Sequence, residues 1–153
     1  MHIRQPNEKE KEIIMKYFTH LLIGLLLIAA AQYSYAKEPN EFTAEFFKLM
    51  EAGKISEAYD GLFVGSQIPA QKPQAVDMLK RQTSSGLPLY GNIVGLEKIR
   101  DEKLGNSIVR LVYVLKSEIA PTIWEFYFYK PKEQWFLANV KFNDQFQSIE
   151  KIQ

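Results

Sequence analysis

The second half of the chain decides the fold, and its clearest stretch is Ser107-Ile-Val-Arg-Leu-Val-Tyr-Val-Leu-Lys-Ser117. Apolar residues recur there at every second position, which is the period of a β-strand with one buried face. The same alternation predicts strands over roughly 92–100, 122–130 and 134–143. The segments between these strands are short enough for hairpin connections, so we expect a four-stranded antiparallel meander.

One face of this predicted sheet carries the larger share of apolar side chains and is expected to pack on helices. Tyr113 contributes to it from the second strand, and Trp124, Phe126 and Phe128 from the third. In the fourth strand, strict alternation places on the same face Phe136, Ala138, Val140 and Phe142.

The opposite face mixes aromatic and charged side chains. Trp135 and Leu137 are expected there, beside Tyr127 and Tyr129. A mixed aromatic face on an open sheet is typical of a subunit interface, which predicts a homodimer anchored by Tyr127, Tyr129 and Trp135. The alternative is a partly exposed sheet whose long charged side chains cover the apolar strips. The sequence leaves both interpretations open.

The first half of the chain has helical periodicity instead. Asn40 is a suitable N-cap for a helix that ends at Gly53. A second, short helix is predicted over about 56–62, and a third begins at Pro73, where a missing N–H costs nothing. Helices followed by strands indicate an α+β domain, with two or three N-terminal helices packed on a curved four-stranded antiparallel meander.

The N-terminal sequence has the features of a secretory signal peptide. The apolar run Leu21–Ala31 is too short to cross a hydrocarbon core of roughly 30 Å, but it fits the hydrophobic region of such a signal. Ser34 and Ala36 occupy the two small-residue positions of a cleavage site. We therefore predict cleavage between Ala36 and Lys37, and an exported, periplasmic or secreted protein with no stable membrane span. The alternative is a retained N-terminal anchor helix.

The predicted leader covers residues 1–36 and the mature chain covers residues 37–153, a length that suits one domain. Signal peptides rarely carry acidic residues before the hydrophobic region, yet Glu8, Glu10 and Glu12 lie there. Lys16 would supply the positive charge of a normal signal that begins at Met15. We therefore expect Met15, rather than Met1, to be the true start.

Composition excludes several classes of chemistry from residues 37–153. The chain has no cysteine, and both histidines, His2 and His20, lie in the predicted leader. This removes thiol nucleophiles, imidazole bases and the usual zinc ligands, so we expect no metal and no cofactor. The leader carries four of the 19 basic and three of the 18 acidic residues, which leaves 15 of each. A balanced chain without a basic cluster is not expected to bind nucleic acid.

Two stretches carry a resemblance to a known superfamily. They are Phe46-Phe-Lys-Leu-Met-Glu-Ala-Gly-Lys-Ile-Ser-Glu-Ala-Tyr59 and Trp135-Phe-Leu-Ala-Asn-Val140. With the order of helices and strands, they resemble the nuclear transport factor two-like superfamily, the cone-shaped fold shared with ketosteroid isomerases. The resemblance covers nearly all of residues 40–143, and the chain looks most like the small exported bacterial members of unknown function.

The resemblance implies a cavity between the helices and the sheet. Its candidate lining residues are Tyr59, Tyr113, Trp124, Phe126 and Phe128. The isomerases need an interior carboxylate as base, and no acidic residue is expected on the inner sheet face.

Three functions therefore remain open. The first is a non-catalytic accessory protein whose cone is filled or holds a small apolar ligand. The second is an isomerase or hydrolyase that uses Asp60 with Tyr59 or Tyr113. The third is an interaction module that docks through the outer sheet face.

Overall fold

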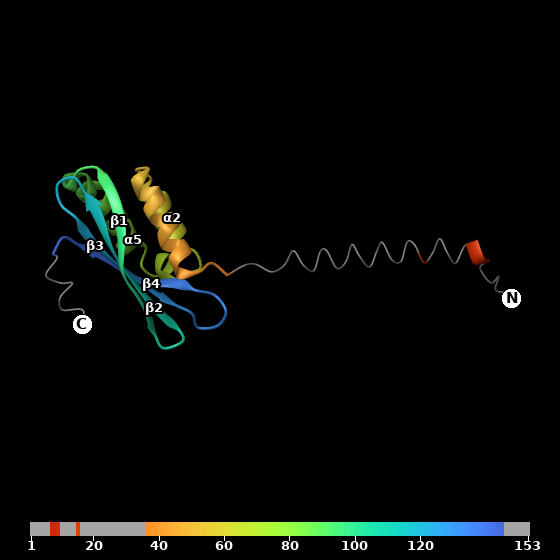
Figure 1. Ribbon diagram of the computed structural model, residues 1–153. Coiled ribbons are helices and arrows are strands. Elements are labelled where there is room, and N and C mark those ends of the chain that lie inside the picture. Colours follow the sequence, from red (N-terminus) through yellow and green to blue (C-terminus); the bar gives the residue numbers. More distant parts are fainter. Residues whose placement is uncertain (1–6, 10–14, 16–35, 146–153) are drawn as a thin grey trace. The chain divides into compact units, whose positions relative to one another are not determined.

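The computed structural model describes residues 7–9, 15 and 36–145 of the 153-residue chain. The chain divides into two compact units, Met1–Tyr35 and Ala36–Gln153. The predicted hydrophobic region of the signal peptide, Leu21–Ala31, lies outside the described residues. The second unit contains the expected α+β domain, with its helices ahead of a four-stranded antiparallel sheet (Figure 1).

The helices of this unit precede the sheet along the chain. They are α2 (Pro39–Glu51), α3 (Ile55–Leu62), α4 (Ile68–Gln71), α5 (Pro73–Gly86) and the 3₁₀ helix η1 (Leu87–Tyr90). The prediction of Pro73 as the first residue of a helix is confirmed. The prediction of Asn40 as the first N-cap is wrong, because α2 begins at Pro39 and Asn40 lies within its first turn. Glu38 is its N-cap, and the backbone N–H of Glu38 donates to the Glu41 carboxylate at 2.8 Å.

The four strands form a meander in which each strand pairs with the next. They are β1 (Ile93–Leu104), β2 (Ile108–Ser117), β3 (Thr122–Tyr129) and β4 (Phe136–Asn143), in the spatial order β1-β2-β3-β4. β1 runs four residues beyond the predicted end at residue 100. Two register shifts, between Ile93 and Gly95 and between Lys98 and Arg100, interrupt its pairing with β2. Such bulges bend a strand and increase its local twist.

A bulge in β4 overturns part of the predicted face assignment. Tyr127 pairs with Asn139 and Phe128 pairs with Leu137, so Ala138 is an extra residue in the register. Because side chains alternate along a strand, one inserted residue reverses the faces on either side of it. Leu137 is therefore fully buried in the core, whereas the predicted inner residue Ala138 is exposed.

The core lies between the helices and the inner sheet face. Phe46 of α2 lies at its centre, with its ring centroid 5.2–5.5 Å from those of Phe47, Tyr59, Trp124 and Phe126. Figure 1 shows α2 running along the sheet on this side. Further buried members of the same cluster are Phe42, Met50, Leu62, Leu111, Leu115 and Leu137. Aromatic pairs at these separations add to the stabilisation that burial alone provides.

Candidate functional site

The five residues predicted to line an interior cavity are all packed into the core. Tyr59, Trp124, Phe126 and Phe128 are fully buried, and Tyr113 is 6% exposed. The structure brings them together: the Trp124 and Phe126 rings stack at 6.3 Å, and the Tyr113 ring lies 5.9 Å from Phe126. Neighbouring side chains thus fill the described interior at these positions.

Both interior tyrosine hydroxyls have buried partners. The Tyr59 hydroxyl lies 2.8 Å from Thr83 Oγ1, and the Tyr113 hydroxyl lies 2.8 Å from Thr43 Oγ1. Burial raises the pKa of the Tyr59 hydroxyl well above its usual range, and burial also raises the pKa of Tyr113. Both groups are therefore neutral hydrogen-bonding groups at physiological pH. Their geometry fits a structural role in joining the helices to each other and to the sheet.

Asp60 does not face the interior. Its side chain is 66% exposed, and one carboxylate oxygen accepts a hydrogen bond from Lys80 Nζ at 2.6 Å. The other oxygen lies 3.5 Å from Ser56 Oγ, one helical turn away on α3. The Asp60 carboxylate is thus held at the surface by Lys80 and Ser56, and the structure does not bring it together with the hydroxyls of Tyr59 and Tyr113.

The outer sheet face carries an ion network that crosses all four strands. Arg110 of β2 is at its centre: Nη2 donates to the Glu125 carboxylate of β3 at 2.9 Å, and Nη1 donates to Glu102 of β1 at 3.0 Å. Arg100 contacts the other oxygen of Glu102 at 3.3 Å, and Lys141 of β4 lies 3.5 Å from Glu125. Burial acts to lower the Arg110 pKa, but the bonds to Glu125 and Glu102 outweigh it, so the pKa is raised and Arg110 remains charged.

The central ion pair of this network is almost fully shielded from solvent. The Arg110 and Glu125 side chains are only 11% and 6% exposed. Forming a buried ion pair costs desolvation energy, and removing one partner is strongly destabilising because it leaves an uncompensated buried charge. The network is therefore a platform of paired charges that links the four strands on the outer face.

An apolar groove of about 370 Å³ lies beside this platform on the same face. We call it the outer groove; it is lined by Ile108, Tyr127, Phe128, Tyr129, Ala138, Asn139 and Lys141. Tyr127 joins the groove to the network, because its hydroxyl donates to Glu125 at 3.2 Å. Tyr129 is 39% exposed and packs edge-on against Phe136, with 5.6 Å between the ring centroids.

Trp135 does not share this face with the two tyrosines. It precedes β4, packs against the core and lies under the Lys130 ammonium, which is 4.9 Å from its ring centroid. Its indole N–H is buried and has no hydrogen-bond partner among the described residues. The predicted outer-face position of Trp135 is therefore wrong. The bulge at Ala138 reverses the faces of the residues before it, so Trp135 lies on the same side as Leu137.

The two residues of the predicted cleavage site open the described part of the domain. Ala36 and Lys37 are both half-buried. The Lys37 ammonium bonds to the Glu45 carboxylate and lies 4.5 Å from the centroid of the Phe42 ring. The chain is thus tied to α2 from Lys37 onward.

Comparisons of the chain with protein-family models, with curated proteins and with solved structures found no significant match. No relative assigns a role to any of these side chains. Within residues 7–9, 15 and 36–145, no helix is both long and apolar enough to cross a membrane. The same residues contain no group of three or more acidic, histidine or cysteine side chains placed to hold a metal ion.

Sequence reasoning missed the ion network and the outer groove. The alternation along β2 and β3 places Arg110 and Glu125 on the outer face, but their pairing depends on the strand register. Arg110 is opposite Tyr127, so Glu125 is its diagonal neighbour on the adjacent strand. Opposite charges at such diagonal positions are the signal that could have revealed the pair. The groove had no comparable signal, because it forms where the β4 bulge exposes Ala138.

Proposed function

We propose that this protein is an exported accessory protein without catalytic activity, which docks a protein partner through the outer sheet face. The observation that carries the proposal is the outer groove, an apolar hollow flanked by Tyr127 and Tyr129 beside the ion network. Tyrosine and arginine are enriched among the residues that supply most of the binding energy at protein interfaces. A second copy of the chain is the partner to test first.

The filled interior supports this choice over a ligand held inside the domain. The side chains predicted to line a cavity pack against one another, and both tyrosine hydroxyls have threonine partners. An isomerase that uses Asp60 gains no support from the geometry, since that carboxylate is exposed and bound by Lys80. The order of helices and strands remains compatible with membership of the nuclear transport factor two-like superfamily, which we retain as part of the proposal.

Export is the second part of the proposal. It rests on the signal-like sequence before Ala36 and on the start of the second compact unit at Ala36, one residue before the proposed cleavage bond. N-terminal sequencing of the protein purified from the periplasmic fraction tests it directly. We expect a mature chain that begins with Lys37. A cytoplasmic protein with an intact leader would contradict export without affecting the docking proposal.

Docking is tested by the mass of the protein in solution. Tyr127→Asp places a charge on the groove wall, so we expect sedimentation equilibrium to show a dimer for the wild type and a monomer for the variant. Met78→Asp is the matched control, because Met78 is 48% exposed on α5, on the helical side of the sheet. If the wild type is a monomer, co-purification with a partner that Tyr127→Asp abolishes would still support the proposal. A wild-type monomer with no Tyr127-dependent partner would overturn it.

A further inference from the structure

Part of the outer sheet face is buried, although it does not belong to the core. Val112 of β2 is fully buried and Ile123 of β3 is 1% exposed, yet neither is a member of the core cluster. Both lie on the outer face, because Val112 is opposite Glu125 and directly opposite residues of two strands share a face. We call Val112, Ile123, Arg110 and Glu125 the covered strip.

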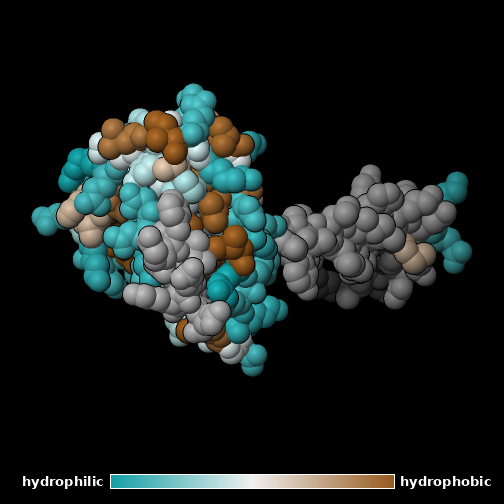
Figure 2. All heavy atoms as spheres, turned by 60° about the vertical axis from the view of Figure 1, so that its left-hand side comes forward, coloured by the Kyte–Doolittle hydropathy of each residue, from teal (hydrophilic) through white to brown (hydrophobic). Residues whose placement is uncertain are grey.

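The described helices do not explain the burial of this strip. They pack on the inner face, and an antiparallel sheet that is covered on one face commonly leaves the other face in water. Figure 2 brings forward the side of the domain on which β3 lies in Figure 1, and hydrophobic atoms reach the surface there between hydrophilic ones. The described surface on this side thus offers apolar ground for a further segment.

Long charged side chains account for only part of the cover. The Arg100 guanidinium is held by Glu102 on its own strand at 3.3 Å, and the Lys141 ammonium lies 3.5 Å from Glu125. The Arg110 and Glu125 side chains could lie over their neighbours, but they are themselves only 11% and 6% exposed. The outermost layer of a face must be exposed to solvent, so a further layer lies over these two side chains.

The chain turns toward the covered strip directly after β4. Asn143 is opposite Ile123, so its side chain lies on the outer face. The side-chain oxygen of Asn143 accepts a hydrogen bond from the backbone N–H of Gln145 at 3.0 Å. A hydrogen bond between an asparagine side chain and the backbone two residues on closes an Asx-turn. This turn draws the backbone at Gln145 toward the outer face.

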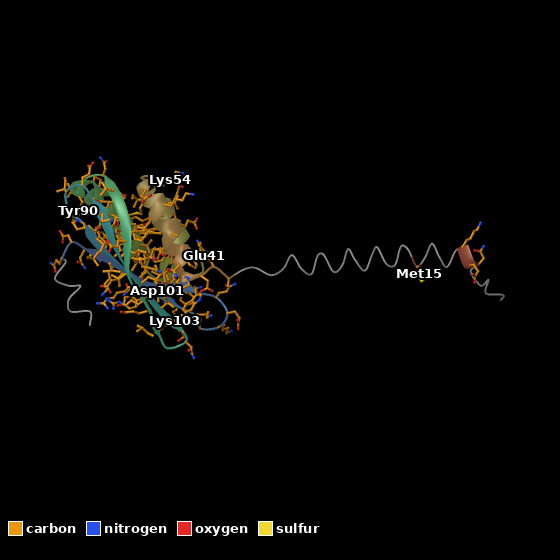
Figure 3. The ribbon with its side chains drawn as sticks, viewed as in Figure 1. Met15, Glu41, Lys54, Tyr90, Asp101 and Lys103 are labelled. Atoms are coloured by element: carbon orange, nitrogen blue, oxygen red, sulfur yellow. The ribbon has the colours of Figure 1, made fainter. Side chains whose placement is uncertain are left out.

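Tyr90 fixes the end of the sheet at which this turn lies. Its hydroxyl donates to the Asp144 carboxylate at 3.0 Å. Figure 3 shows Tyr90 at the end of the domain away from Lys103, and β3 begins at the same end as Tyr90, at Thr122. The rest of the chain therefore starts beside the covered strip, whereas the outer groove lies around Ile108 at the other end of β2.

Residues 146–153, which we call the C-terminal segment, have the length and the pattern of a cover. As a helix they would span about 12 Å, and Val112 lies two strands from β4, about 10 Å away. The apolar residues of the segment recur at every third position, which places them on one side of a helical turn: Phe146, Ile149 and Ile152. Its two charged residues, Glu150 and Lys151, are opposite in sign and fall outside that side.

We propose that the C-terminal segment folds back over the outer sheet face and covers Val112 and Ile123. Its three apolar residues pack on these two side chains. The outer groove stays open, since Tyr129 is 39% exposed. The segment thus limits the apolar surface that the outer face offers a partner to this groove. This inference does not depend on whether a partner binds there.

The test is nuclear magnetic resonance on the ¹³C-methyl-labelled protein as isolated from cells. We expect nuclear Overhauser effects between the methyl groups of Val112 and Ile123 and the protons of Phe146 and Ile149. A soluble gadolinium chelate, which relaxes exposed protons, should affect these methyl groups as little as those of Leu111, which is fully buried on the inner face. A mixture of labelled and unlabelled protein should show that the contacts lie within one molecule.

Two variants with the same added charge locate the contact. Ile149→Asp places a carboxylate on the apolar side of the segment. We expect the chelate to relax the Val112 and Ile123 methyl groups several-fold faster in this variant, with Leu111 unchanged. Gln147→Asp is the matched control on the opposite side of the same segment, and it should behave like the wild type.

A chain that ends at Gln145 lacks the whole cover and should show the largest effect. The proposal fails on any of three results. They are an absence of contacts between the C-terminal segment and the covered strip, contacts that come from a second molecule, and methyl groups of Val112 and Ile123 that stay protected in both Ile149→Asp and the shortened chain. The Overhauser measurement needs no variant, so it stands even if the shortened chain does not fold.

Discussion

The two faces of the four-stranded sheet bury different kinds of side chain. On the inner face, Phe46 of α2 packs against Trp124 and Phe126, and the few polar groups are tyrosine hydroxyls paired with threonines. On the outer face, Arg110 and Glu125 are almost as well buried, although both are charged. The side chains of the inner face are packed against the helices. The groups that can recognise a partner, which are polar and aromatic, lie on the outer face.

The first prediction tests the packing of the inner face. Phe46→Ala removes the ring at the centre of the aromatic cluster, and we expect the free energy of unfolding to fall by about 4 kcal/mol. Urea denaturation followed by tryptophan fluorescence measures the change. Leu89→Ala, at a residue that is 75% exposed, should change stability by less than about 0.5 kcal/mol. A loss below about 1 kcal/mol for Phe46→Ala would mean that the core is not packed around this ring.

The second removes one partner of the outer ion pair. Arg110→Met leaves the Glu125 carboxylate 6% exposed without its main partner, and we expect a loss of about 3 kcal/mol. Lys141 and Tyr127 still contact Glu125, which keeps the loss toward the lower end of the expected range. The double variant Arg110→Met, Glu125→Leu should recover most of this stability, because no charge is left buried. A double variant as unstable as the single one would contradict the account of the outer face.

The third prediction tests the bulge in β4, which exchanges positions between the inner and the outer face. Leu137→Ala truncates a fully buried side chain and should cost about 2–3 kcal/mol. Ala138→Ser, one residue away on the outer groove, should stay within about 0.5 kcal/mol. The same denaturation measurements apply. Equal costs at the two positions would argue against the bulge.

The fourth concerns the polar groups of the inner face. Burial holds the pKa of Tyr59 above its usual value near 10, so the unfolded chain ionises first as the pH rises. The contribution of Tyr59 to stability is complete below pH 10 and is lost above it. Tyr59→Phe should cost about 1 kcal/mol at pH 7, because Thr83 Oγ1 loses its partner. The variant should then lose less stability than the wild type between pH 9 and 11, and a parallel pH profile would contradict this linkage.

The sequence predicted the inner face well where alternation is uninterrupted. Tyr113, Trp124, Phe126 and Phe128 are buried as expected, because β2 and β3 pair without a register shift. The prediction failed at β4, where one extra residue exchanges Leu137 and Ala138 between the faces. A bulge is set by the pairing of two strands, so a pattern within one strand cannot reveal it.

The candidate site was harder to predict than the fold. Tyr127 and Tyr129 do lie on the outer face, but Trp135 packs against the core because the bulge in β4 reverses the faces of the residues before it. The Arg110–Glu125 pair requires the exact register of β2 and β3, and the outer groove requires the bulge in β4. Both are tertiary features that bring together residues far apart in sequence, for which local propensity and period carry no information.

A crystal structure of the protein purified from the periplasm would test the central claim most directly, because it examines both sheet faces at once. We predict a filled interior around Phe46, and a two-fold contact that covers Tyr127 and Tyr129 and buries at least about 800 Å² on each partner. A molecule bound inside the domain against Tyr59 or Tyr113, with the outer groove left in solvent, would contradict the account.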